Sequence, residues 1–227
     1  MKVIVQKILA ERGLCSRREG ERLVAAGKVT INGAVARVGA FADPDKDDVA
    51  IAGQAADIPK MTVAVYKPRG IVCSKNTAEG KTVFELLPQY ASLNTVGRLD
   101  KESEGLLLLT NDGRLTRAVT GDDHRIEKEY IVDVREELFP GLMQKMEKGI
   151  MIDGERTLPC IAKMRENRRS FSIVLKEGKK HQIRRMCDAC HLTVLSLKRI
   201  RIGDVRLLKL RPGNVRPLTR AEVESFI

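Results

Sequence analysis

Hydrophobic positions in the first 50 residues follow first a helical and then a strand spacing. Apolar residues three and four apart predict a helix over 3–12, and Gly13 suits its left-handed end. Ser16-Arg17-Arg18-Glu19 has the pattern of a capping box and predicts a second helix up to residue 27. Strands at 29–31 and 35–38 flank the turn dipeptide Asn32-Gly33, and 47–51 can complete a small sheet.

Beyond residue 60 the pattern is dominated by short apolar runs. Strands are predicted over 62–66, 106–109, 130–134, 160–162 and 170–175, and helices over 137–149 and 181–189. Because strands outnumber helices without a regular β-α-β alternation, we expect an α+β fold with a mixed, mainly antiparallel sheet. Residues 54–60 lack periodicity and contain a proline. We therefore expect a small α/β domain over 1–53, a linker over 54–60 and a larger domain over 61–227.

The net charge of the chain indicates what kind of partner it binds. The chain of 227 residues has 41 Lys and Arg against 30 Asp and Glu, a net charge of +11. Residues 176–220 hold 13 basic and 3 acidic residues, and residues 1–40 hold 8 and 3. Two basic regions favour a long phosphate backbone that is contacted at two places.

Apolar runs are all shorter than the roughly 18 residues of a membrane span. At the N-terminus Gln6, Lys7 and Glu11 interrupt the apolar core that a signal peptide needs. We expect a cytoplasmic protein without a membrane partner.

The five cysteines are an odd number, which favours reduced thiols over a disulfide framework. Cys187-Asp188-Ala189-Cys190-His191 has the spacing of c-type haem attachment and offers three metal ligands. Haem attachment of that type needs export, and a zinc site needs a second ligand pair. We interpret these cysteines as packed thiols on a helix, and expect neither a metal nor a cofactor.

The segment with the clearest chemical potential is Gly97-Arg98-Leu99-Asp100-Lys101-Glu102-Ser103-Glu104-Gly105, a polar loop that leads into an apolar strand and on to Asn111-Asp112-Gly113. Residue types alone leave three interpretations of its carboxylates open. They fit a solvated acidic loop, a divalent-metal site, or the nucleophile and acid of a glycosidase-like reaction.

This segment resembles the catalytic motif of the pseudouridine synthases, in particular of the RsuA-like ribosomal enzymes that carry an S4 domain. Three further segments match that family in order: Lys67-Pro68-Arg69-Gly70, Lys128-Glu129-Tyr130 and residues 178–186. Residues 1–52, with LAERGLCSRREGERLVAAGKVTING, resemble the S4-type RNA-binding domain. The resemblance implies an S4-like domain followed by a pseudouridine synthase catalytic domain. Lys180-His181 departs from the branch, which often carries Asn-Arg there, and is closer to a sister branch.

The resemblance also implies a catalytic set. Asp100 is the expected nucleophile, Arg184 the cation that keeps it charged, and Tyr130 the aromatic residue that stacks on uracil and serves in proton transfer from C5. The reaction breaks the bond between ribose C1′ and uracil N1, rotates the base and rejoins it through C5. An ionised aspartate can attack C1′ or take a proton from the sugar, and both routes stay open.

Other positions are expected to hold the base or the RNA. Arg98 would enter the helix as the uridine leaves it, and Ile183 would lie beneath the base. His181 is a candidate general base that we leave out of the catalytic set. The expected RNA-binding residues are Arg17, Arg18, Arg22 and Lys28 in the first domain, and Lys179, Lys180 and Arg185 in the second.

The substrate implied by the resemblance is ribosomal RNA, free or in an assembling subunit. One S4-like domain and one catalytic domain can work as a monomer. Asn111-Asp112-Gly113, the Asp122-Asp123-His124 region and Lys128-Glu129-Tyr130 favour 23S over 16S rRNA. A non-catalytic S4-type RNA-binding protein would explain the charge but not the second domain. A glycosidase-like hydrolase would need a second acid in a matching motif, and we find none.

Overall fold

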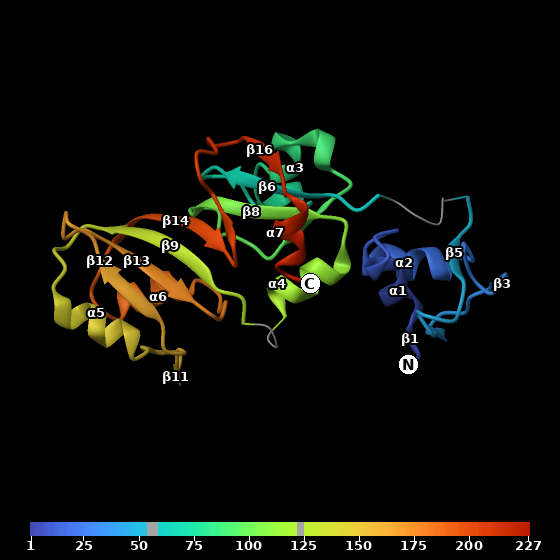
Figure 1. Ribbon diagram of the computed structural model, residues 1–227, viewed down its shortest axis with the longest axis horizontal. Coiled ribbons are helices and arrows are strands. Elements are labelled where there is room, and N and C mark those ends of the chain that lie inside the picture. The colour runs from blue at the N-terminus through green and yellow to red at the C-terminus, as the bar shows by residue number, and fades with distance from the viewer. Residues whose placement is uncertain (54–58, 122–124) are drawn as a thin grey trace.

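The computed structural model describes residues 1–53, 59–121 and 125–227 (Figure 1). Its first part contains β1 (Val3–Ile4), α1 (Val5–Glu11), α2 (Arg17–Ala25), β2 (Val29–Ile31), β3 (Ala34–Val35), β4 (Phe41–Ala42) and β5 (Val49–Ile51). Both predicted helices are present, although the first begins later because β1 pairs with β4. Asn32 and Gly33, with φ of 50° and 81°, make the predicted turn between β2 and β3. Ser16 caps α2 by accepting a hydrogen bond from the Glu19 amide.

This first part has a hydrophobic core of its own. Val5, Ile8 and Leu9 of α1 are at most 1% exposed and pack with Val24 of α2 and Val29 of β2. The helical spacing seen in the sequence therefore turns one face of α1 towards the small sheet.

Residues from 61 onwards are built on one nine-stranded sheet of order β12-β13-β9-β14-β8-β6-β16, with β7 beside β8 and β15 beside β14. Its strands are β6 (Thr62–Lys67), β7 (Asn94–Val96), β8 (Glu104–Thr110), β9 (Lys128–Val134), β12 (Ile161–Met164), β13 (Ser170–Leu175), β14 (Val194–Ile202), β15 (Val205–Arg206) and β16 (Val215–Pro217). Only the β14–β8 pair is parallel among the strand pairs of the described residues. The predicted mixed, mainly antiparallel sheet is confirmed.

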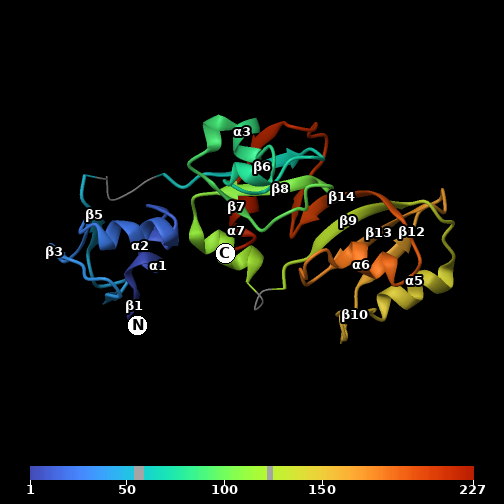
Figure 2. The ribbon, with the colours of Figure 1, turned by 180° about the vertical axis from the view of Figure 1, so that it is seen from behind.

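Helices cover the two ends of this sheet separately. They are α3 (Val83–Leu86), α4 (Gly113–Thr120), α5 (Pro140–Glu147), α6 (Gln182–Asp188) and α7 (Arg220–Glu224), with the short turns η1 (Thr77–Glu79) and η2 (Pro88–Tyr90) and the hairpin of β10 (Met151–Ile152) and β11 (Glu155–Arg156). Figures 1 and 2 show α5 and α6 under one end of the sheet and α4 and α7 under the other. Two hydrophobic clusters correspond to these ends.

The strand β14 joins the two ends, since it pairs with β9 on one side and with β8 on the other. The middle of the sheet thus lies between two helix-covered cores, and a hollow at this place is the expected consequence. None of the helices in the described ranges is long and apolar enough to cross a membrane.

Candidate active site

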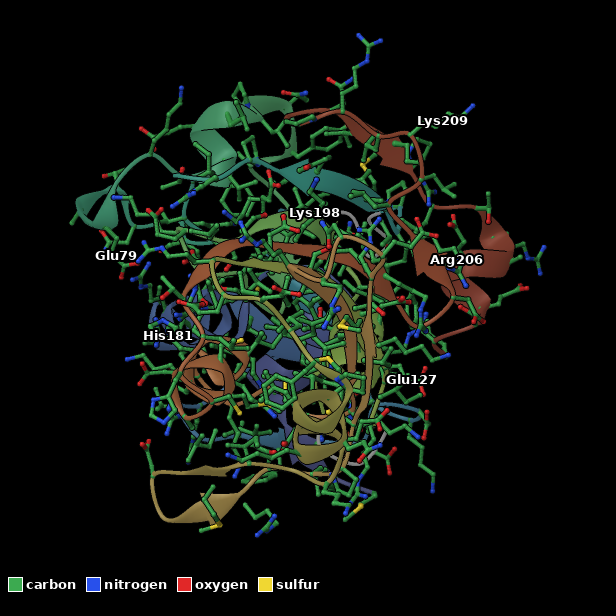
Figure 3. The ribbon with its side chains drawn as sticks, turned by 90° about the vertical axis from the view of Figure 1, so that its left-hand side faces the viewer. Glu79, Glu127, His181, Lys198, Arg206 and Lys209 are labelled. Atoms are coloured by element: carbon green, nitrogen blue, oxygen red, sulfur yellow. The ribbon has the colours of Figure 1, made fainter. Side chains whose placement is uncertain are left out.

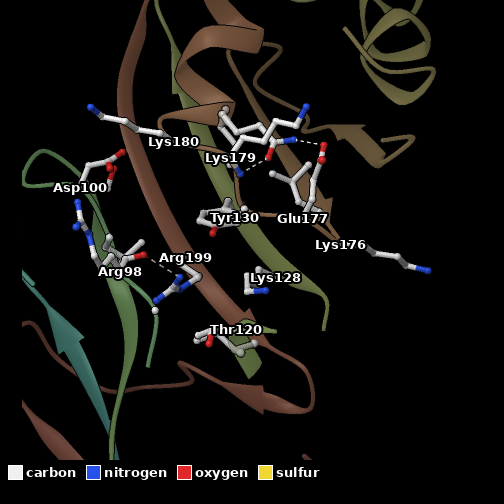
Figure 4. A pocket seen from close by; sticks show the side chains of 18 of the residues that line it. Arg98, Asp100, Thr120, Lys128, Tyr130, Lys176, Glu177, Lys179, Lys180 and Arg199 are labelled. Carbon is white, nitrogen blue, oxygen red and sulfur yellow. Dashed lines mark hydrogen bonds between the residues drawn. The ribbon is translucent and has the colours of Figure 1, made fainter. Parts of the chain in front are cut away.

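A pocket of about 720 Å³ lies between the two ends of the sheet. It is lined by the loop of Arg98 and Asp100, by Lys128 and Tyr130 of β9, by Arg199 of β14, and by the segment from Lys176 to Ile183 that leads into α6 (Figure 4). The pocket is large enough for a small organic group such as one base.

The Asp100 loop is held from several sides. The Ser103 amide donates to the Asp100 carbonyl at 3.0 Å, which closes a turn. The Gly70 amide donates to the Lys101 carbonyl at 2.8 Å, and Arg69 pairs with Glu102 at 2.8 Å. The Lys67-Pro68-Arg69-Gly70 motif therefore braces the loop that carries the candidate nucleophile.

Asp100 has a different partner from the one expected. Oδ1 of Asp100 lies 3.4 Å from Nε2 of His181, and the two side chains are 33% and 49% exposed. Arg184 donates instead to the carbonyl of Glu102 at 3.0 Å and to Oγ of Ser103 at 3.4 Å. Among the described residues no ion pair joins Arg184 to Asp100, so in this structure Arg184 supports the loop's backbone. Arg184 contacts the backbone because the turn from Asp100 to Ser103 points the Glu102 carbonyl at the Arg184 guanidinium.

The other residues proposed around the base do converge. Tyr130, Ile183 and Arg98 all line the pocket with Asp100. Ile183 is 5% exposed and belongs to the core beneath β9, so it is both a core residue and part of the pocket wall. Arg98 is exposed at the mouth, which suits a side chain that reaches into the RNA.

The basic residues expected to bind RNA fall into three places. Arg17, Arg18, Arg22 and Lys28 are exposed on or after α2. Lys179 and Lys180 line the pocket, whereas Arg185 does not. Lys179 pairs with Glu155 at 2.6 Å and Arg185 pairs with Asp153, both in the β10–β11 hairpin.

The basic C-terminal region predicted as one cluster is divided by the fold. In Figure 3 His181 and Arg206 lie on opposite sides of the molecule, with Lys209 on the side of Arg206. Lys176, Lys179 and Lys180 before α6 and Arg199 of β14 border the pocket, whereas Arg206 and Lys209 do not line it.

The two glutamates of the loop take no part in the pocket. Glu102 is 54% exposed and its hydrogen bond from Arg69 lowers its pKa. Glu104 lies 3.5 Å from Nζ of Lys198. Because neither lines the pocket beside Asp100, the paired-carboxylate arrangement of a glycosidase is not formed by these residues.

The cysteines of the Cys187–His191 motif are part of the core. Cys187 is fully buried, and burial raises the pKa of its thiol to about 12. Cys190 is 8% exposed in the same cluster. No group of three or more His, Cys, Asp or Glu side chains in the described parts of the chain is placed to hold a metal ion.

Sequence reasoning placed Lys128 in the Lys128-Glu129-Tyr130 motif without giving it a role, and it did not name Arg199. Lys128 lies two residues before Tyr130, so strand alternation puts both on one face. Arg199 is the register partner of Tyr130 on β14. The place of Lys128 beside Tyr130 could have been predicted from the alternation of side chains along the strand. The place of Arg199 could not, because it depends on the pairing of β14 with β9.

Comparison with known proteins gives two family matches. The RNA pseudouridylate synthase family matches residues 61–189, and the S4 domain matches residues 5–45. The ribosomal large subunit pseudouridine synthase B of Bacillus subtilis is 32% identical over 232 residues, covering 98% of this chain and 94% of the relative. The ribosomal small subunit pseudouridine synthase A of Vibrio parahaemolyticus is 34% identical, covering 97% and 98%.

A solved structure is similar along the whole length. A crystal structure of a pseudouridylate synthase matches with a TM-score of 0.74 and 28% identity, covering 99% of this chain and all of that one. The order of domains, the fold and the motifs around the pocket thus agree with one another. The chain belongs to the RNA pseudouridylate synthase family, with an S4 domain at its N-terminus.

Proposed function

We propose that this protein converts a specific uridine of ribosomal RNA to pseudouridine, with Asp100 as the carboxylate that acts at the sugar. The observation that carries the proposal is the convergence of Asp100, Tyr130 and Ile183 in one pocket. An acceptor carboxylate, an aromatic ring and an apolar wall are the groups that a flipped uridine needs.

The preferred substrate is 23S rRNA. Relatives named for the large and for the small subunit both match this chain over nearly its full length, at 32% and 34% identity. These similarities make 16S rRNA the alternative. Two of the three segments that favour 23S are described, and the third, Asp122-Asp123-His124, lies outside the described residues.

The architecture suits a monomer of two domains, with boundaries at 1–53 and 61–227. Arg17, Arg18, Arg22 and Lys28 would hold structured RNA while Lys179 and Lys180 guide the strand at the pocket mouth. Arg185 would join them when RNA displaces Asp153. The protein would act in the cytoplasm, on free rRNA or on an assembling subunit.

The test uses unmodified 23S and 16S rRNA transcripts. Each is incubated with the protein, and pseudouridine is mapped by carbodiimide treatment and primer extension. One new stop on 23S rRNA is the expected result. A stop on 16S rRNA alone would move the substrate to the small subunit, while unchanged patterns on both would overturn the proposed function.

A further inference from the structure

Two basic side chains in the interior part of the pocket, Arg199 and Lys128, are not paired with a carboxylate among the described residues. Arg199 is 3% exposed, and Lys128 is half-buried. Neither forms an ion pair with a carboxylate in the described part of the chain. Burying a positive charge is costly unless something compensates for it, so these two side chains call for an anion or a strong acceptor.

Within residues 1–53, 59–121 and 125–227, the hydrogen bonds of Arg199 and Lys128 leave some of their N–H donors unused. Nε of Arg199 donates to the Leu106 carbonyl at 2.7 Å, and one terminal nitrogen donates to the Arg98 carbonyl at 3.4 Å. The other terminal nitrogen is buried and has no hydrogen-bond partner among the residues that the structure describes. Nζ of Lys128 donates to the Ile126 carbonyl at 3.1 Å, one acceptor for a group with three N–H bonds.

The strands place these donors together. Arg199 is the register partner of Tyr130, and Lys128 shares the Tyr130 face of β9. Lys128 and Arg199 also interact electrostatically. The pKa of Lys128 is lowered, mainly by burial and to a smaller extent by the positive charge of Arg199. Figure 4 shows Arg199 between Arg98 on one side and Tyr130 and Lys128 on the other.

A glycine makes this arrangement possible. Gly105 of β8 lies opposite Arg199 in the parallel pair, and a Cβ on Gly105 would stand 2.2 Å from the Arg199 carbonyl oxygen. The absence of a side chain lets β8 approach β14 closely enough for Arg199 to reach the Leu106 carbonyl. The guanidinium is thereby fixed before any substrate enters.

The proposed reaction forms an anion, the freed uracil base, in the pocket that Arg199 and Lys128 line. When the bond between C1′ and N1 breaks, its electron pair stays on uracil, whether Asp100 has attacked C1′ or has removed a sugar proton. The freed base therefore carries a negative charge shared by N1 and its carbonyl oxygens until C5 bonds to C1′. Donors that are fixed in advance where charge develops lower the barrier to such a step.

We propose that Arg199 and Lys128 bind the uracil ring through its carbonyl oxygens and stabilise the uracil anion during the isomerisation. This inference rests on the proposed function. A backbone phosphate is the competing ligand, but phosphates stay with the strand at the surface, whereas the flipped base enters the pocket. Arg199, far less exposed than Asp100, is placed for the base.

Single-turnover rates test the proposal on two RNAs that differ only at the target base, uridine or 5-fluorouridine. Fluorine withdraws electrons and makes the base a better leaving group. Lys128→Gln and Arg199→Lys are compared with the wild type by measuring loss of the target nucleoside after digestion and chromatography. Arg201→Lys is the matched control, because Arg201 is in the same strand but pairs with Glu127 and Glu129 outside the pocket.

The expected result is a loss on the order of 100-fold with uridine for each pocket variant, with RNA affinity little changed. The loss should shrink at least several-fold with 5-fluorouridine, while Arg201→Lys stays near the wild type on both. An equal loss on both bases would assign Lys128 and Arg199 a merely structural role and overturn the proposal.

A third RNA with an uncharged methylphosphonate beside the target separates the base from the phosphate. If the variants lose their defect only on this RNA, the cations bind phosphate and the proposal is wrong. A wild-type protein that converts none of these RNAs, nor native rRNA, would instead remove the proposed function itself.

Discussion

Asp100 is the residue on which the proposed chemistry depends. Its side chain is held at the pocket by a turn with three outside supports, and its Oδ1 lies 3.4 Å from Nε2 of His181. A carboxylate in this position is acceptor-only and can act as a nucleophile or a base, whereas an amide of the same shape cannot.

Asp100→Asn should therefore reduce turnover by at least about 1,000-fold, with RNA affinity unchanged within roughly threefold. Pseudouridine formation is followed on rRNA under single-turnover conditions, and binding is measured by filter retention. Glu104→Gln is the matched control, since Glu104 is a carboxylate of the same motif but lies beside Lys198 and does not line the pocket. Retained activity in Asp100→Asn would take Asp100 out of its role.

The hydrogen-bond partners of Arg184 and His181 could not be predicted from the sequence motifs. The motif around residue 184 pointed to the Asp100 loop, and Arg184 does contact that loop. The spacing of the motifs could not show whether Arg184 contacts a backbone carbonyl or the Asp100 carboxylate. That contact depends on side-chain conformations, and Arg184 is 82 and 81 positions away in sequence from Glu102 and Ser103, the residues it contacts. His181 likewise reaches Asp100 from a left-handed backbone position, with φ of 52°, which a pattern of residue types does not predict.

Among the elements, those with strong periodicity were predictable. The strand predicted over 170–175 matches β13 at both ends, and the runs at 62–66 and 106–109 match β6 and β8 within two residues. The long strand β14 was not predicted, because its alternation of basic and apolar residues also fits an exposed segment. Its place in the middle of the sheet comes from long-range pairing with β9 and β8.

The parallel pair of β8 and β14 depends on a glycine at position 105. Gly105 has φ of +107°, and an added Cβ would collide with the backbone of Arg199. Gly105→Ala should lower the free energy of unfolding by about 2–4 kcal/mol, since two central strands must move apart. Urea unfolding followed by circular dichroism gives the value.

Gly154→Ala provides the comparison. Gly154 also has positive φ, +80°, but no atom of the described residues lies within 4 Å of an added Cβ. It should cost only about 1 kcal/mol for backbone strain. Equal losses in the two variants would show that the close approach of β8 to β14 is not what requires Gly105.

At the scale of the whole molecule, α1 contacts the N-terminus of α4. Glu11 forms an ion pair with Arg117, and Nζ of Lys60 donates to the Glu11 carbonyl at 3.2 Å. The amide-rich start of α4 comes so close to α1 that a Cβ on Gly113 would stand 2.7 Å from the Ala10 carbonyl oxygen. The Asn111-Asp112-Gly113 segment, which in sequence belongs to the catalytic motif, thus also forms the contact between the two parts of the chain.

Gly113→Ala tests whether this contact sets the arrangement of the two parts in solution. Gly113 begins α4 without a positive φ, so alanine fits the helix itself and overall stability should stay within about 1 kcal/mol. The added methyl group should instead push α1 away, and small-angle X-ray scattering should report a larger radius of gyration. Gly141→Ala, in α5 and with only ordinary contacts to the Phe139 ring at 3.6 Å, should scatter like the wild type. Identical curves for all three proteins would mean that the α1–α4 contact does not hold the S4 domain in place. The face of α2 that we propose to bind RNA would then owe its position relative to the pocket to the bound RNA.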